Sequence, residues 1–185
     1  KLLDSTVRIN IWENYDDDEL RETVSGGSGV FLNKVNGKIY ILTNAHVLLD
    51  KYVLFDGEDI GYDDSLTMVV DTTTSVNEYV FTYEDILYWQ DADIAIIVLD
   101  TKIYNELSSE IFVVPEIYDG NAPPLLEVYV AGFPWVKGNY ADYNNIFVDK
   151  CVINSYVVDD ENMEDTLGYE IIHDCNVSGG MSGGP

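Results

Sequence analysis

Short runs in which hydrophobic and polar residues alternate recur along most of this chain. The first, residues 7–12, reads V-R-I-N-I-W, so that apolar side chains occupy every second position. This period of two predicts a β-strand with one buried face. Comparable strand-like runs follow at residues 30–33, 38–43, 52–55, 66–70, 79–83, 94–99, 111–114, 128–131, 146–156 and 169–175. Gly, Asn and Asp turns separate them, which indicates an all-β sandwich or barrel.

Helical patterns are short and few. Residues 48–49 and 104–107 suit single helical turns, and no long amphipathic helix pattern is present. The polar stretch around residues 99–110 is the best place for a join between two halves. We therefore expect an N-terminal half at 1–105 and a C-terminal half at 106–185.

Composition is that of a globular chain. The 185 residues are 46% hydrophobic and 23% charged, enough for one ordinary domain or two small packed halves. No apolar run approaches the roughly 18 residues that span a membrane, so no membrane insertion is expected. The opening KLLDSTVRIN has no signal-peptide pattern. A secreted, periplasmic or cytoplasmic location all stay open.

Charge is strongly unbalanced. The chain has 34 acidic residues against 9 Lys and Arg, a formal net charge of −25. Such a surface repels nucleic acids and favours basic peptides or a basic protein partner. The acidic runs at 16–18 and 159–161 lack the spacing of a calcium loop and are interpreted as solvated turns. No metal site is expected, since His173 and Cys175 have no second pair of ligands.

The two cysteines lie on either side of a polar loop, DDENMEDTL. If the flanking runs form a hairpin with Val158 opposite Gly168, Cys151 lies opposite Cys175. Their Cα atoms are then about 4.5 or 5.5 Å apart, within reach of a disulfide. Two buried thiols in a reducing compartment account for the pair equally well.

Three residues have settings that suit a nucleophilic serine site. His46 follows a strand in ILTNAHVL, Asp93 precedes an apolar strand in DADIAIIVLD, and Ser182 lies among glycines in GGMSGGP. Taken singly, each has an ordinary structural explanation, as a core histidine, a turn cap or a Gly-rich turn. A serine nucleophile, however, needs an adjacent base, and the base needs a third group to orient it. Together the three residues supply those chemical types.

The same segments resemble the chymotrypsin/trypsin-like serine peptidase family. The likeness rests on GSGVFL…YILTNAHVL, DADIAIIVLD and GGMSGGP in the order His, Asp, Ser, and it covers nearly the whole chain. VYVAGFPW and GYEIIHDCNVSGGMSGGP add a likeness to bacterial trypsin-like and glutamyl-endopeptidase-like domains. The resemblance implies two packed Greek-key β-barrels with the site between them. It also implies a serine endopeptidase that needs no cofactor.

The resemblance supplies the residue roles. Ser182 is the expected nucleophile, His46 the general base and then acid, and Asp93 the group that orients the imidazole. The glycines permit a sharp turn in which the N–H groups of Gly180 and Ser182 form an oxyanion hole. The expected partner is a peptide or protein substrate.

Three positions qualify this picture. Met181 stands where zymogen-activated members carry an Asp, so no activation by N-terminal insertion is expected. Asn176 matches the base of the primary specificity pocket, and its neutral amide argues against Lys or Arg. Small or neutral side chains, or Glu, are expected there instead. Asp91 competes with Asp93 as the orienting acid, and Asp93 is favoured because it directly precedes the Ile-Ala strand.

The sequence stops at Pro185, whereas the family's second barrel continues past the serine. We therefore expect an incomplete second barrel, with the remaining C-terminal strands supplied by the same polypeptide. A catalytically silent, protease-like interaction module with an acidic partner-binding surface is the alternative function. A ligand-binding β domain ranks last, because it leaves the ordered His, Asp and Ser unexplained.

Overall fold

Regular structure in the described part of this chain is almost wholly β. The computed structural model describes residues 2–14, 21–49, 66–72, 78–102, 113, 115–116, 123–134, 146–157 and 170–185. Within these ranges ten strands form two antiparallel sheets, with one short α-helix and three 3₁₀ turns. The all-β fold predicted from the alternating pattern is confirmed.

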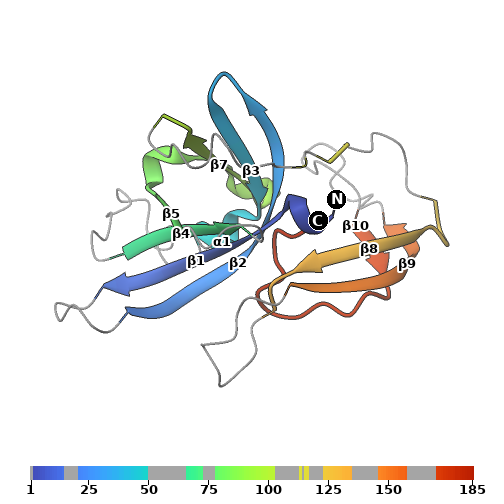
Figure 1. Ribbon diagram of the computed structural model, residues 1–185. Helices are drawn as coiled ribbons and strands as arrows, with labels where there is room; N and C mark the ends of the chain where they lie inside the picture. Colours follow the sequence, from blue (N-terminus) through green and yellow to red (C-terminus); the bar gives the residue numbers. More distant parts are fainter. Residues whose placement is uncertain are drawn as a thin grey trace.

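The first sheet has seven strands in the order β5-β4-β1-β2-β3-β7-β6. Their bounds are β1 (Thr6–Asn14), β2 (Arg21–Val35), β3 (Lys38–Thr43), β4 (Leu66–Thr72), β5 (Glu78–Phe81), β6 (Ile86–Trp89) and β7 (Ile94–Asp100). The two edge strands, β5 and β6, are consecutive in the chain and joined only through the turn η2 (Tyr83–Asp85). The sheet must therefore curl until its edges meet, which gives it the form of a barrel (Figure 1).

Alternate side chains of this sheet fill the inside of the curl. On the adjacent strands β3 and β7, Ile39 lies opposite Leu99 and Ile41 lies opposite Ile97. All four side chains are buried in one core cluster, and the residues between them are more exposed. The period of two in the sequence is thus the alternation between the two faces of the barrel wall.

One α-helix, α1 (Ala45–Leu49), follows β3 directly. Its Ala45, Val47 and Leu48 are buried in the barrel core, whereas His46 is exposed. The apolar residues therefore anchor the helix and leave His46 at the surface. The helical turn predicted at 48–49 is present, and the turn predicted at 104–107 lies outside the described residues.

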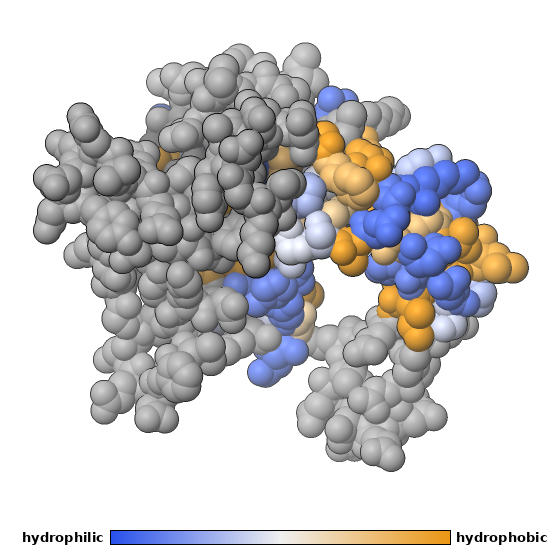
Figure 2. Space-filling view, turned by 90° about the horizontal axis from the view of Figure 1, so that it is seen from below, coloured by the Kyte–Doolittle hydropathy of each residue, from blue (hydrophilic) through white to orange (hydrophobic). Residues whose placement is uncertain are grey.

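The second sheet has three strands in the described residues, β8 (Glu127–Gly132), β9 (Phe147–Val157) and β10 (Glu170–His173), in the order β10-β9-β8. It lies to the right of the first sheet in Figure 1. Several of its large apolar side chains are exposed, among them Tyr129, Phe147 and Ile171. Apolar and polar surface are interspersed on this side of the molecule (Figure 2).

β9 and β10 form the predicted hairpin, with a correction of one residue. His173 lies opposite Ile153, as the predicted register requires. Ile172, however, lies opposite Ser155, one residue beyond its predicted partner, because the register shifts between Ile172 and His173. A bulge in β9 takes up the extra residue. The loop predicted between the strands lies outside the described residues.

Other strand predictions need correction. β2 begins at Arg21, far ahead of the predicted 30–33, because its first half is Gly- and Ser-rich and shows no apolar alternation. β6 was missed, since its ILYW run follows β5 after only a short turn. The strand predicted at 111–114 is wrong at Val113, which lies in no strand. The run at 52–55 lies outside the described residues.

The C-terminal segment, residues 174–185, connects the two sheets. It leaves β10 and returns to the first sheet (Figure 1). The N–H of Ala131 in β8 donates to the carbonyl of Pro185 at 2.9 Å, and the N–H of Ser28 in β2 donates to the carbonyl of Ser182 at 2.7 Å. The Gly-rich serine segment is therefore bonded to both sheets.

Candidate active site

His46 and Asp93 are in contact although 47 residues separate them. The Nδ1 atom of His46 lies 2.8 Å from Oδ2 of Asp93, and the main-chain N–H of His46 donates to Oδ1 at 2.9 Å. Because the carboxylate accepts, Nδ1 carries the proton in this contact. In the neutral imidazole this leaves Nε2 as an acceptor, which is the form that a general base requires.

The strand pairing explains why these residues meet. β3 and β7 are antiparallel neighbours, and Thr43 at the end of β3 lies opposite Ala95 near the start of β7. The residues just beyond Thr43 and those just before Ala95 therefore emerge at the same end of the barrel. His46 and Asp93 belong to these two groups.

Asp93 has an unusual backbone conformation that its neighbours stabilise. Its φ is +50°, in the left-handed region that few non-glycine residues adopt. Its carbonyl accepts hydrogen bonds from the N–H of Ala45 at 3.1 Å and from Nδ2 of Asn44 at 3.0 Å. Nδ2 of Asn44 also donates to Oδ2 of Asp93 at 3.1 Å. Together with His46, these donors hold both the backbone and the carboxylate of Asp93.

Asp91, the competing acid, lies in the turn η3 (Gln90–Ala92) and is exposed. The acid that bonds to His46 is Asp93.

The electrostatics of the pair favour an ionised acid. The side chains of His46 and Asp93 are 47% and 46% exposed. Partial burial alone would raise the pKa of the Asp93 carboxyl. Hydrogen bonds from the main chain and ring of His46, together with attraction to its charge, outweigh that effect and lower the pKa below its ordinary value. Asp93 is therefore a carboxylate at neutral pH and can stabilise an imidazolium beside it.

The segment that carries Ser182 packs against the residues leading to His46. Gly183 has a φ of +81°, and a Cβ there would collide with Oγ1 of Thr43 and the carbonyl of Ser28. The same Cβ would lie 3.0 Å from the main-chain nitrogen of Asn44. Only glycine allows this close approach, so the sequence SGG places Ser182 beside the start of α1.

The serine loop contains the residues of the predicted oxyanion hole. Gly180 has a φ of +91°. The N–H of Met181 donates to the carbonyl of Ser178 at 3.1 Å, and the N–H of Gly184 donates to the carbonyl of Met181 at 3.0 Å. Within the described part of the chain, neither Gly180 nor Ser182 uses its N–H in a hydrogen bond.

One contact of the predicted triad is not made. Among the residues that the structure describes, no hydrogen bond joins the hydroxyl of Ser182 to the ring of His46. The structure thus brings two of the three side chains into contact and the third into the same neighbourhood. The catalytic roles stay predictions.

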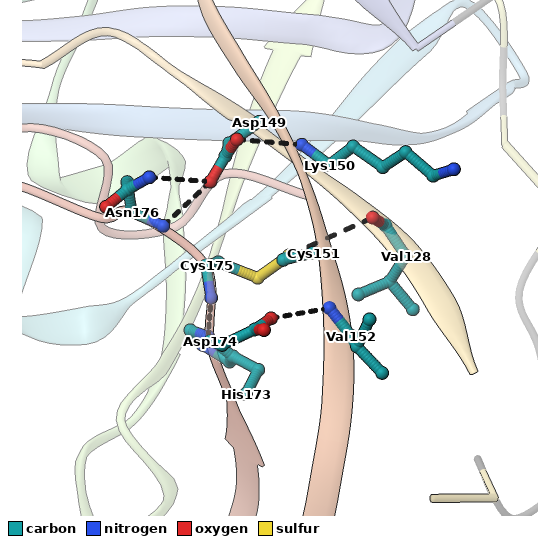
Figure 3. The surroundings of a disulfide bond; sticks show 9 residues. All are labelled: Val128, Asp149, Lys150, Cys151, Val152, His173, Asp174, Cys175 and Asn176. Carbon is teal, nitrogen blue, oxygen red and sulfur yellow. Dashed lines mark hydrogen bonds between the residues drawn. A yellow bond between two sulfur atoms is a disulfide. The ribbon is translucent and has the colours of Figure 1, made fainter. Parts of the chain in front are cut away.

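Cys151 and Cys175 are joined by a disulfide, with their Cα atoms 4.8 Å apart (Figure 3). The bond links the middle of β9 to the start of the C-terminal segment. His173 accepts a hydrogen bond from the N–H of Cys175 at its Nδ1, at 3.1 Å. Asp174 accepts one from the N–H of Val152 at 2.7 Å. These contacts fix the beginning of the segment that carries Ser182.

Asn176, predicted at the base of a specificity pocket, is exposed and bonded to Asp149 of β9. Its N–H and its Nδ2 both donate to the same oxygen, Oδ2 of Asp149, at 2.8 and 3.3 Å (Figure 3). The amide of Asn176 is therefore oriented by a carboxylate. Its place in a pocket stays a prediction.

Sequence reasoning missed two residues, Asn44 and Ser28. Asn44 lies in the motif TNAH, between the end of a strand and the helix. An Asn in such a position often bonds to nearby backbone groups, so its hydrogen bonds could have been predicted. Ser28 is buried in β2 and bonds to the serine loop. Ser28 lies among glycines in the interior of a strand, and such glycines indicate that another backbone segment packs closely against the strand. They do not identify that segment.

Two features are absent from the described part of the chain. No three His, Cys, Asp or Glu side chains there are grouped so that they could hold a metal ion. Nor does any helix in those ranges have the length and apolar character needed to cross a bilayer.

Comparison with known families gives a match over most of the chain. The sequence model of the trypsin-like peptidase domain matches residues 27–185, a range that contains His46, Asp93 and Ser182. Comparison with curated proteins gives no match. The likeness to glutamyl endopeptidases stays a prediction.

Proposed function

The chain belongs to the trypsin-like peptidase domain family, and on that premise we propose that it is a serine endopeptidase. Ser182 is the nucleophile, His46 the general base and acid, and Asp93 the orienting carboxylate. The observation that carries the proposal is the 2.8 Å contact between Nδ1 of His46 and Oδ2 of Asp93, beside a Gly-rich loop with a serine.

In the first step Nε2 of His46 takes the proton of the Ser182 hydroxyl as Oγ bonds to the carbonyl carbon of the substrate. The electron pair of the carbonyl moves to its oxygen, which becomes an oxyanion. The N–H groups of Gly180 and Ser182 donate to that oxygen. Asp93 stabilises the imidazolium that forms, because its lowered pKa keeps it ionised.

In the second step the imidazolium gives its proton to the leaving nitrogen, and the carbon–nitrogen bond breaks. An acyl group is left on Ser182. Water then repeats the sequence, with His46 as the base, and restores the free hydroxyl. Protons and electrons balance without an oxidant, reductant or cofactor.

A hydrogen bond between Ser182 and His46 is required during the first step. Such contacts are often long in free enzymes and tighten when substrate binds. Its absence among the described residues is also the observation that favours the alternative, a silent protease-like module that binds partners through its acidic surface. The test must therefore separate a reactive serine from an inert one.

A fluorophosphonate probe makes that distinction, because it bonds only to an activated serine. We expect the protein to be labelled, and labelling to be lost in Ser182→Ala and in His46→Ala. Asp93→Asn should label slower by orders of magnitude, as the loss of the orienting acid misaligns the imidazole. Ser178→Ala is the matched control, since it removes a serine hydroxyl from the same loop and should label normally.

Two results overturn the proposal. Absence of labelling in the unaltered protein favours the silent module, and labelling that persists in Ser182→Ala places the reactive group elsewhere. The rates of peptide hydrolysis by these variants must rank in the same order as their rates of labelling.

The substrate class follows from charge. A formal net charge of −25 attracts basic peptides and proteins over long range. We therefore expect kcat/KM for a peptide with basic residues outside the cleaved bond to fall as ionic strength rises, and that of a neutral peptide to change little. Equal salt dependence for both peptides would argue against recruitment by surface charge.

A further inference from the structure

Ser28 is a fully buried polar residue of β2, at 0% exposure. Its hydroxyl donates to the carbonyl of Gly180 at 2.8 Å and accepts from the N–H of Phe133 at 2.9 Å. Its main-chain N–H donates to the carbonyl of Ser182 at 2.7 Å. One residue of the first sheet is thus bonded twice to the serine loop and once to the segment that follows β8.

The surroundings of this hydroxyl are tightly packed. A Cβ on Gly132 would lie only 2.9 Å from the hydroxyl oxygen of Ser28 and 3.0 Å from Cα of Met181, so the backbones are already in close contact. Loss of the hydroxyl leaves the carbonyl of Gly180 and the N–H of Phe133 without partners in a buried place. Such unpaired groups are costly and favour rearrangement of the backbone.

The bonds of Ser28 hold the two peptide groups on either side of the one that carries the N–H of Ser182. Three successive carbonyls, those of Gly180, Met181 and Ser182, all accept hydrogen bonds, and Ser28 provides two of the donors. In a trans peptide the N–H points opposite to the carbonyl. Fixing these carbonyls therefore fixes the peptide planes that lead into and out of Ser182.

We infer that Ser28 is a positioning residue for the oxyanion hole. Its hydroxyl holds the peptide between Gly180 and Met181 so that the N–H groups of Gly180 and Ser182 stay turned toward one point. Ser28 does not touch the substrate and acts through the loop. The inference rests on the proposed endopeptidase function. It adds that the hydroxyl of Ser28 links the first sheet to the serine loop.

The first test compares Ser28→Ala with Ser5→Ala. Ser5 is also buried, at 1% exposure, and its hydroxyl donates to the carbonyl of Leu2 at 2.8 Å. Both variants lose one short serine-to-carbonyl hydrogen bond. We expect Ser28→Ala to lower kcat by at least about ten-fold, but by less than the roughly 100- to 1,000-fold loss caused by removing an oxyanion donor itself. KM should change less than about three-fold, because the lost contact acts on the transition state.

A second pair of variants distinguishes the effect of the hydroxyl group from the effect of side-chain volume. Ser28→Thr and Ser28→Val add similar bulk, but only Thr keeps a hydroxyl. Any strain from the added methyl group is common to both variants. We expect Thr to retain clearly more kcat than Val, and a Val variant as active as the Thr variant would overturn the inference.

Amide hydrogen exchange gives a readout that does not depend on activity. In Ser28→Ala the N–H of Phe133 and the N–H of Met181 should exchange faster, and in Ser5→Ala they should keep their protection. If the unaltered protein hydrolyses peptides and Ser28→Ala retains its kcat, the positioning role is wrong while the proposed function stands. If the unaltered protein is inert to peptide and probe, the proposed function fails. Exchange then decides separately whether Ser28 orders the loop, and unchanged protection overturns that too.

Discussion

The side-chain amide of Asn44 donates hydrogen bonds to both the carbonyl and the carboxylate of Asp93, at 3.0 and 3.1 Å. One amide therefore fixes the backbone and the side chain of the residue that bonds to His46. Asp93 needs this support because its φ of +50° is unfavourable for a residue with a Cβ. Strain of this kind persists where the surrounding contacts over-determine the conformation, and it is often found at functional sites.

Asn44→Ala should therefore impair catalysis more than its exposure suggests. Loss of both hydrogen bonds lets Asp93 relax and misaligns His46, so we expect kcat to fall about ten-fold. The free energy of unfolding should fall by about 1–2 kcal/mol. Hydrolysis and urea unfolding measure the two effects. Asn33→Ala is the control, because Asn33 is exposed and its side chain accepts from the N–H of Lys34, the next residue in the chain. Equal activity in the two variants would contradict this role for Asn44.

The pKa of Asp93 predicts how stability depends on pH. Burial raises this pKa, but the hydrogen bonds from His46 lower it below the unfolded value of about 3.9. The stabilising contribution of the carboxylate is then present above about pH 4 and lost as pH falls through the lower folded pKa. We expect Asp93→Asn to be less stable than the unaltered protein at pH 5, with the difference shrinking below pH 4. Urea unfolding at each pH measures it, and a difference that grows on acidification would contradict the pKa shift.

The barrel core and one edge of the site could be read from the sequence. KIYILT and IAIIVLD are apolar runs that predict strands, and in the structure every second residue of β3 and β7 is buried. Because these strands are neighbours, the polar residues at their ends meet, which is the origin of the contact between His46 and Asp93. Local pattern and tertiary structure agree here.

The contacts of the segment that carries Ser182 could not be predicted from the sequence in the same way. The first half of β2 is Gly- and Ser-rich because other segments approach its backbone closely. A Cβ on Gly27 would lie 2.7 Å from Val47 and 3.0 Å from the carbonyl of Ser182. The contact with Ser182 joins residues more than 100 positions apart, and no local periodicity records it. The hydrogen bonds of Ser28 and Asn44 are also made to distant parts of the chain. The Gly-rich setting and the resemblance to a family pointed to Ser182, but not to the residues that contact it.

The disulfide gives a prediction about stability. Closing a loop over a separation of 24 residues restricts the unfolded chain and contributes about 3.5 kcal/mol. Replacing Cys151 and Cys175 together by Ser should lower the free energy of unfolding by roughly that amount. Urea unfolding with and without reductant measures it. Reductant should destabilise the unaltered protein and leave the double variant unchanged, and a protein insensitive to reductant would show that the bond contributes nothing.

Gly183 is expected to tolerate no side chain. Its φ of +81° disfavours any Cβ, and an added methyl group would meet Thr43 and the backbone of Ser28. Gly183→Ala should cost at least about 2 kcal/mol and abolish probe labelling, because the loop must leave its place. Gly179→Ala is a matched control from the same loop, since a Cβ there meets nothing within 4 Å. Normal labelling of Gly183→Ala would contradict the assigned backbone contact.

The contact between Asn176 and Asp149 determines how the predicted pocket can be changed. Oδ2 of Asp149 accepts from the N–H and from Nδ2 of Asn176, at 2.8 and 3.3 Å. Asn176→Asp alone replaces a donor with a second carboxylate, so repulsion should raise the pKa of one acid and destabilise the protein at neutral pH. It should therefore give little cleavage after Lys or Arg. Combining it with Asp149→Asn restores a donor–acceptor pair and leaves a single carboxylate at position 176, so cleavage after Lys or Arg should rise about ten-fold over the single variant. A peptide library read by mass spectrometry measures both. Strong cleavage after Lys or Arg by the single variant would show that Asp149 does not constrain this position.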